Sequence, residues 1–301
     1  MALMAHAGWP ILLGLLLAAP MSAKNLPVKG ATLDLQIHTE KRIITDAQIE
    51  EAVGEAARTV VGYYGKFPVK ELKVEVYPNP RQPNGFFGQA FNGRRVTLYV
   101  GSSAKPEKLR QDWILVHEMF HLGFPDLDDA KYNWIGEGLS TYLEGIARVR
   151  SGNLAPEKLW EDFLDGFADA LPRPGDGGLN TERRYRREYW GGALFWFLMD
   201  LEIREKTKGL KSLDNAMLRI LDEGGTGGMV WSLDELIDSL DKASGFPIGR
   251  RYYERFGPRP ATEDLPALWK KLGIVKQNGK ITFDPKAPLA ATLKALHTSK
   301  N

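Results

Sequence analysis

The feature that most constrains this chain is an apolar stretch that carries two histidines four residues apart. In residues 109–124, LRQDWILVHEMFHLGF, apolar side chains occur on nearly every side of a helix, which is typical of a buried helix. Because residues four apart lie one turn apart on one face, His117 and His121 can reach the same ion, with Glu118 beside them. Without a ligand, each of these buried polar groups would cost about 1–3 kcal/mol. The pattern therefore predicts a metal site.

The residue types that are absent narrow the chemistry of this site. The sequence has no cysteine, so disulfides, thiolate zinc sites and cysteine nucleophiles are excluded, and any metal must be bound by His, Asp or Glu. A structural zinc site is closed by four side chains, whereas a catalytic site uses three and keeps a position for water. We expect one catalytic Zn²⁺, with Glu118 as the general base that takes a proton from this water.

A third protein ligand is needed besides His117 and His121. The metzincin pattern does not fit, because position 127 is leucine and the nearby glycine, Gly123, is out of step with it. A loop after Pro125 holds three acidic residues that are expected to act as turn and cap residues: Asp126, Asp128 and Asp129. A better candidate is Glu137, which lies sixteen residues after His121 in the helical pattern NWIGEGLSTYLEGIARV.

Glu144 lies seven residues after Glu137 and therefore on the same helix face. There it could accept a hydrogen bond from the second ring nitrogen of a ligand histidine. A solvated charge on the helix surface is the alternative.

Periodicity along the chain separates a sheet-rich part from a helical part. Alternating residues predict strands at 31–38 and 72–77, with a helix from Thr45 to about Val61 between them. Asn92-Gly93 predicts a hairpin turn within 85–101. Helical periodicity then dominates, at 107–122, 133–150, 156–171, 186–207, 212–223, 232–244 and 264–272. We expect an α+β fold: a small antiparallel sheet in an N-terminal lobe, 24–104, followed by a helical lobe, 105–301, with the metal between them.

The N-terminus suggests export. Residues 8–19 form an apolar run that is short for a membrane span, and Ala23 offers a small residue before a cleavage point. We interpret residues 1–23 as a signal peptide of a periplasmic or secreted protein, with an uncleaved anchor as the alternative. The formal charge of +2 gives no reason to expect a nucleic acid, or a membrane partner beyond that anchor.

Two segments of the helical part resemble a known family. WIGEGLSTYLE resembles the W-x-x-E-G segment of gluzincin aminopeptidases, both aminopeptidase N and the glycyl aminopeptidase-like peptidases. The resemblance implies a thermolysin-like zincin fold with Glu137 as third zinc ligand and Glu144 behind the ligands. The segment that begins REYWGG is similar to the glycyl aminopeptidase-like catalytic domain, which implies that Tyr189 donates a hydrogen bond to the developing oxyanion. The lysine of that family segment is Gly191 here.

The resemblance covers residues 85–275 and departs from the family upstream of the metal motif. Aminopeptidases have an acid there that binds the free amine of the substrate, whereas the stretch GQAFN, 88–92, has none. This stretch could pair with an extended peptide or serve only as a hairpin strand. The run Arg183, Arg184, Arg186 and Arg187 could meet a carboxylate of a substrate, although such runs are more often solvated.

The leading hypothesis is a zinc metallopeptidase of the gluzincin type that acts on a peptide or protein. A catalytically silent relative that binds a peptide or a partner protein in the same groove is the main alternative. A purely structural helical module is the third.

Overall fold

The computed structural model describes residues 20–39 and 41–298. Most of the predicted signal peptide, residues 1–19, lies outside this part of the chain, and the expected cleavage point after Ala23 falls within the first strand. The leader, the export and the lobe boundary at 104 therefore stay predictions. Within the described residues, no helix is long and apolar enough to cross a membrane.

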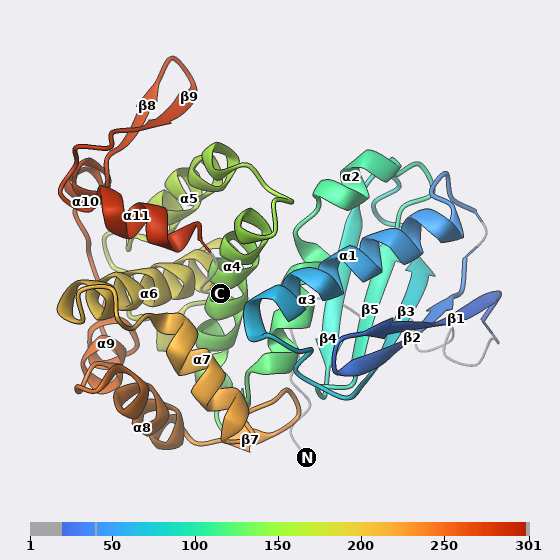
Figure 1. The fold of residues 1–301 in the computed structure, drawn as a ribbon, viewed down its shortest axis with the longest axis horizontal. Helices are drawn as coiled ribbons and strands as arrows, with labels where there is room; N and C mark the ends of the chain where they lie inside the picture. The colour runs from blue at the N-terminus through green and yellow to red at the C-terminus, as the bar shows by residue number, and fades with distance from the viewer. Residues whose placement is uncertain (1–19, 40, 299–301) are drawn as a thin grey trace.

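A five-stranded sheet forms the N-terminal third of the chain, in the order β1-β2-β3-β5-β4 (Figure 1). Its strands are β1 (Ser22–Val28), β2 (Ala31–Ile37), β3 (Glu71–Pro78), β4 (Phe86–Phe91) and β5 (Arg95–Val100). The expectation of an antiparallel sheet was wrong in part. The outer pairs β1–β2 and β4–β5 are antiparallel, but the central pairs β2–β3 and β3–β5 are parallel. The pair β2–β3 is parallel because α1 (Asp46–Tyr64) connects these strands as a crossover. The pair β3–β5 is parallel because the edge strand β4, which lies between them in the sequence, runs antiparallel to β5.

Helix α1 covers one face of the sheet, and its ends are defined by local chemistry (Figure 1). Thr45 and Gln48 form a capping box at its start, and Gly65 ends it with φ 80°, a left-handed conformation that suits glycine. The buried side of α1 packs in one core with the apolar residues of the central strands.

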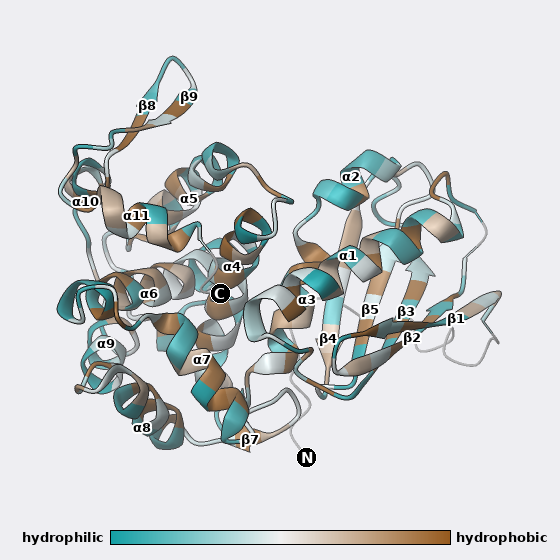
Figure 2. Cartoon of the chain, viewed as in Figure 1, coloured by the Kyte–Doolittle hydropathy of each residue, from teal (hydrophilic) through white to brown (hydrophobic). Residues whose placement is uncertain are grey.

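The helical half follows the sheet in the sequence and lies beside it in Figure 1. The helices that build it are α2 (Pro106–Gln111), α3 (Ile114–Phe120), α4 (Asn133–Arg150), α5 (Pro156–Ala170), α6 (Tyr185–Lys206), α7 (Leu213–Asp222), α8 (Leu233–Ser244), α9 (Gly249–Phe256), α10 (Leu265–Leu272) and α11 (Ala290–Leu296). Two short two-stranded sheets lie between these helices in the sequence. β6 (Asp126–Leu127) pairs with β7 (Val230–Trp231), and β8 (Ile274–Gln277) pairs with β9 (Lys280–Phe283). Teal and brown alternate along α7 and α8 in Figure 2, as expected for helices with one buried side.

The single helix expected at 107–122 is two helices, because the chain turns at Asp112 and Trp113. The Asp112 backbone is extended, and its carboxylate accepts a hydrogen bond from the Ile114 N–H at 3.0 Å. Such a side chain satisfies a free donor at a helix start and so allows a new helix to begin. The metal motif therefore stands on its own short helix, α3.

Helices α4 and α6 approach each other closely at two glycines. A Cβ added to Gly138 would lie 2.2 Å from the Gly192 backbone, so neither position has room for a side chain. Trp196 of α6 donates to the Ile135 carbonyl of α4 at 2.8 Å, and both Trp196 and Trp134 are fully buried. This contact fixes the residues of α4 relative to those of α6, including Glu137 and Tyr189.

Candidate metal centre

Helix α3 brings the two histidines of the motif into the core. All seven of its residues are buried, from Ile114 to Phe120. The backbone stays helical at His121, where a 3-10 turn (η1, His121–Gly123) continues the helix. The imidazoles of His117 and His121 therefore lie one turn apart, with their Nε2 atoms 3.3 Å apart.

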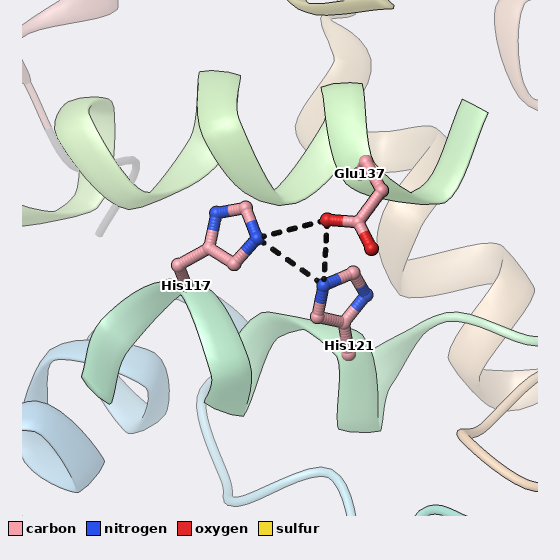
Figure 3. A group of neighbouring side chains, drawn as sticks. All are labelled: His117, His121 and Glu137. Atoms are coloured by element: carbon pink, nitrogen blue, oxygen red, sulfur yellow. Dashed lines mark hydrogen bonds and ion pairs between the residues drawn. The ribbon is translucent and has the colours of Figure 1, made fainter. Parts of the chain in front are cut away.

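Glu137 of α4 faces this pair of histidines (Figure 3). Its Oε2 lies 3.2 Å from His117 Nε2 and 3.5 Å from His121 Nε2. The candidate ligand atoms of the three residues all lie within 4.8 Å of one another. These three side chains, which we call the triad, could hold a metal ion.

The triad fits zinc by distance and by donor type. Zinc–nitrogen and zinc–oxygen bonds of about 2.0–2.1 Å in a tetrahedron place neighbouring ligand atoms about 3.3–3.4 Å apart. The three distances in the triad, 3.2, 3.3 and 3.5 Å, agree with those tetrahedral edges. Two imidazoles and one carboxylate are also the set that catalytic zinc sites use when a fourth position is left for water.

The charges within the triad favour a cation. Burial alone would raise the pKa of Glu137, but the charge of His121 and hydrogen bonds from both histidines hold it well below its usual range. Burial would lower the pKa of His121, but Glu137 above all, and also Glu118 and Asp126, raise it to about 9. Burial lowers the pKa of His117. A carboxylate that stays ionised in the core thus stands between two imidazoles.

Glu118 lies beside the triad and against strand β4. Burial is the main cause that raises its pKa, to about 7, while the charge of His121 and a hydrogen bond with the Ala90 backbone N–H oppose the shift. A Cβ added to Gly88 would lie 2.7 Å from Ile114 Cγ1 and 3.0 Å from Glu118 Cγ. Gly88 therefore leaves the space that Glu118 occupies.

The hydrogen bond from Ala90 also shows in which direction the backbone groups of β4 point. Because its N–H points to Glu118, Ala90 and Val96 form a pair without ladder hydrogen bonds. At the other end of the strand the Gly101 N–H donates to the Gly85 carbonyl, so this pair is hydrogen-bonded. Hydrogen-bonded and non-hydrogen-bonded pairs alternate along an antiparallel ladder, so Gly88 and Ala90 both fall in non-hydrogen-bonded pairs. The backbone groups of Gly88 and Ala90 thus point away from β5, at the edge of the sheet next to Glu118.

Tyr189 of α6 lies over the triad. Its ring is stacked on His117, with ring centroids 5.6 Å apart and an interplanar angle of 6°. Its hydroxyl hydrogen bonds with Glu137, and burial above all, then the charge of Glu137, raises its pKa far above the usual value. The phenol is therefore a neutral hydrogen-bond donor within the site.

Glu144 does not have the position expected from its spacing. Its carboxylate accepts a hydrogen bond from Arg148 Nη1 at 3.0 Å, while the buried Nδ1 of His117 has no hydrogen-bond partner. Seven residues of helix correspond to about 10 Å along the axis, which carries Glu144 past the histidines. Burial raises its pKa to about 7, and Arg148 opposes the shift. In this structure Glu144 therefore pairs with Arg148, and its role behind the ligands stays a prediction.

The other acidic and basic candidates have structural partners. Asp129 caps the turn η2 (Ala130–Tyr132), as its place in the loop predicted, by accepting from the Lys131 N–H at 3.0 Å. The arginine run spans the start of α6; Arg183 and Arg186 are exposed, as expected for a solvated run, and Arg187 is buried. Three of its side chains form ion pairs with nearby acids: Arg184 with Asp176 and Glu182, Arg187 with Glu182, and Arg186 with Asp169.

Sequence reasoning missed two residues of this site, Gly88 and Tyr185. Gly88 was noticed only as part of GQAFN, although a glycine in a strand often marks a close approach of another group. Tyr185 lies one turn before Tyr189 on α6, with ring centroids 4.1 Å apart. The spacing of four was the signal that could have revealed it.

Comparison with known proteins agrees with this geometry at the level of the fold. The sequence matches no family model and no curated protein. An aminopeptidase N family protein from Idiomarina loihiensis has a similar structure, with a TM-score of 0.66 and 16% identity over 85% of this chain. An M1 zinc metallopeptidase from Deinococcus radiodurans has a TM-score of 0.54 and 15% identity over 82% of this chain. A variant of that protein bound to the substrate Tyr-Ser-Ala has a TM-score of 0.55 and 15% identity over 82% of this chain.

This chain covers 50% of the Idiomarina structure and 52% and 54% of the Deinococcus structures, so it corresponds to about half of each. At such low identity the likeness concerns the fold. The resemblance noted in the sequence is thus confirmed at that level: the chain has the mixed α/β fold of M1 aminopeptidase N-like zinc metallopeptidases.

Proposed function

We propose that this protein is a zinc-dependent peptidase in which His117, His121 and Glu137 bind the metal. The observation that carries the proposal is the convergence of three ligand atoms at 3.2–3.5 Å beside the buried carboxylate of Glu118. The structural neighbours named as zinc metallopeptidases support it, since one of them binds a tripeptide substrate. Bound zinc would supply Lewis-acid chemistry: it polarises a carbonyl group and lowers the pKa of water to about 7.

Glu118 would act as the general base. Its pKa of about 7 is close to neutral pH, the range in which a carboxylate can both accept and return a proton. It would take the proton of the attacking water and pass it to the leaving nitrogen of the peptide bond.

Tyr189 would stabilise the negative charge that develops on the carbonyl oxygen. A neutral phenol can donate a hydrogen bond there without ionising, and its high pKa keeps the proton in place. The backbone groups of Gly88 and the carbonyl of Ala90, which point away from β5, would pair with an extended peptide, as sheet edges do in other peptide-binding proteins.

The second candidate is a silent protein that binds a peptide or a partner in this groove. The observation that favours it is the lack of an acid in residues 88–92, where the related aminopeptidases have one, so the amine of a substrate has no counter-charge on this strand.

The Glu118→Gln variant tests the proposal. We expect kcat on a mixed peptide library to fall about 10²–10⁴-fold, the usual contribution of a general base. Zinc content, measured by elemental analysis, should stay at one per chain, because Glu118 is not a member of the triad. Equal rates for the variant and the parent would contradict the assigned base. A zinc-loaded parent that binds peptides but cleaves none would favour the silent protein.

A further inference from the structure

The two helices that carry the triad are also connected at a point far from it. His117 and His121 belong to α3 and the turn η1, and Glu137 lies near the start of α4 (Figure 3). Arg148 follows Glu137 by eleven residues on α4, which corresponds to about 16 Å along the helix axis. Its guanidinium reaches the residues just before α3. Helices α3 and α4 therefore run in opposite directions and are in contact at two distant points.

Arg148 donates hydrogen bonds to both sides of this second connection. Its Nη1 donates to Glu144 Oε2 on its own helix at 3.0 Å, and its Nη2 donates to the Gln111 carbonyl, at the end of α2, at 2.6 Å. The side chain is only 7% exposed. A buried charge without partners is costly, so the guanidinium is held to these two acceptors. Glu144 thus orients the guanidinium toward the Gln111 carbonyl.

The turn between α2 and α3 passes this contact on to the metal motif. Asp112 follows Gln111 with an extended backbone, and its carboxylate accepts at 3.0 Å from the N–H of Ile114, the first residue of α3. A cavity of about 20 Å³, with room for about one water molecule, borders Arg148 and is lined also by Asp112 and Leu115. Side-chain packing is thus incomplete at this place, and the hydrogen bonds of Arg148 connect α4 to the start of α3.

We propose that Arg148 is a positioning residue for the metal centre: it fixes where the start of α3 lies along α4. Because the backbone hydrogen bonds make a helix stiff over a few turns, a slide of α4 along α3 would move Glu137 relative to the histidines by a similar distance. Zinc sites keep their bond lengths within about 0.2 Å, so even a small slide would disturb the ligand distances of 3.2–3.5 Å. The inference rests on the proposed function only in that the triad must bind zinc.

The test compares Arg148→Met with the matched control Arg150→Met. Arg150 lies on the same helix, and its side chain is also 7% exposed. It also donates to one carboxylate and one backbone carbonyl, those of Asp214 at 3.0 Å and Leu296 at 2.9 Å. These acceptors belong to α7 and α11, and not to the segment before α3.

Zinc affinity and the geometry of the metal site are the two readouts. Competition with a chromogenic chelator should show an affinity about tenfold to 100-fold lower in Arg148→Met, the usual effect of losing support behind metal ligands. In Arg150→Met the affinity should stay within about twofold of the parent, even where urea denaturation shows similar losses of stability. Cobalt(II) in place of zinc has a visible spectrum that depends on coordination geometry, and only Arg148→Met should change it. The spectrum separates a displaced metal site from a general loss of stability.

Arg148→Lys and Arg150→Lys repeat the comparison if a methionine variant does not fold. Lysine keeps the charge but lacks the planar fork that donates to two acceptors at once. Arg148→Lys should therefore lower zinc affinity by about twofold to tenfold, the effect of one net hydrogen bond. Unchanged affinity and an unchanged cobalt spectrum in the Arg148 variants, or equal changes in the Arg150 variants, would overturn the positioning role. A parent that binds zinc but cleaves no peptide would refute only the peptidase proposal, whereas a parent that binds no zinc would refute both.

Discussion

Two buried polar clusters in this protein use the same kinds of charge in different ways. The first is the triad. The second, which we call the Asp200 cluster, joins α4, α6 and α7 and consists of Tyr142, Arg150, Asp200, Arg204 and Asp214. The Asp200 carboxylate accepts from three protein donors: Tyr142 OH at 2.9 Å, Arg204 Nε at 3.0 Å and Leu213 N at 2.7 Å.

The difference lies in what faces the buried carboxylate. Asp200 is surrounded by donors that the chain itself supplies, so its charge is compensated within the fold. Glu137 faces two imidazole nitrogens that become acceptors for a metal ion when they lose their protons, and the ligand atoms of all three residues lie within 4.8 Å of one another. A buried acid with internal partners is a structural element, whereas converging acceptors leave a place for a cation.

The largest expected effect is on protein stability, at Asp200. Asp200→Ala removes one partner of a buried ion pair, which should lower the free energy of unfolding by about 3–5 kcal/mol. Urea denaturation followed by circular dichroism would measure it, with Asp200→Asn as the control that keeps the shape and part of the hydrogen bonding. Zinc binding to the folded fraction should not change. Loss of zinc without loss of stability would break the distinction between the clusters.

The reverse behaviour is expected at Glu137. Glu137→Gln removes the negative charge of the triad, while His121 stays protonated at neutral pH. Replacing a residue behind the metal ligands typically lowers metal affinity by about 10–100-fold. Loss of a ligand charge should lower zinc affinity by more than about 100-fold. The matched control is Glu144→Gln on the same helix, which should leave zinc affinity unchanged because Glu144 pairs with Arg148. Competition with a chromogenic chelator measures both. Equal losses in the two variants would restore the role first expected for Glu144.

The smallest of the three effects concerns pH. In the metal-free protein His121 keeps its proton up to a pKa of about 9, yet a ligand histidine must be neutral. Zinc affinity should therefore rise about tenfold per pH unit from pH 7 to about 9, with release of about one proton per zinc at pH 7. Calorimetry in two buffers of different ionisation enthalpy would measure this proton. Affinity that is flat over the range would contradict the coupling of His121 to Glu137.

His121 also affects the stability of the metal-free protein, which should fall with rising pH while zinc affinity rises. Its pKa is raised from the usual 6.5 to about 9 by the neighbouring acids. Its contribution to stability is therefore fully present below about pH 6.5 and lost as the pH rises through 9. Zinc would remove this dependence, because the histidine then has no proton to lose.

The amino-acid sequence alone determined those features that depend on local patterns. Periodicity predicted most helices of the second half, among them 133–150, which α4 matches residue for residue. The spacing of His117 and His121 predicted their common helix face, and the lack of cysteine limited the donors to His, Asp and Glu. These inferences hold because helix geometry relates neighbouring residues over one or two turns whatever the rest of the chain does.

Only the tertiary structure decided the features that depend on distant segments. The approach of α4 to α3 brings Glu137 to the histidines and carries Glu144 past them, although both lie on one helix face. The crossover through α1 makes β2 and β3 parallel, and the packing of β4 against α3 directs the Ala90 N–H to Glu118. The contact of Gly138 with Gly192 sets the position of α6 and thus of Tyr189 and Tyr185. Periodicity carries no information on such distances, because they arise from how side chains of remote elements pack together.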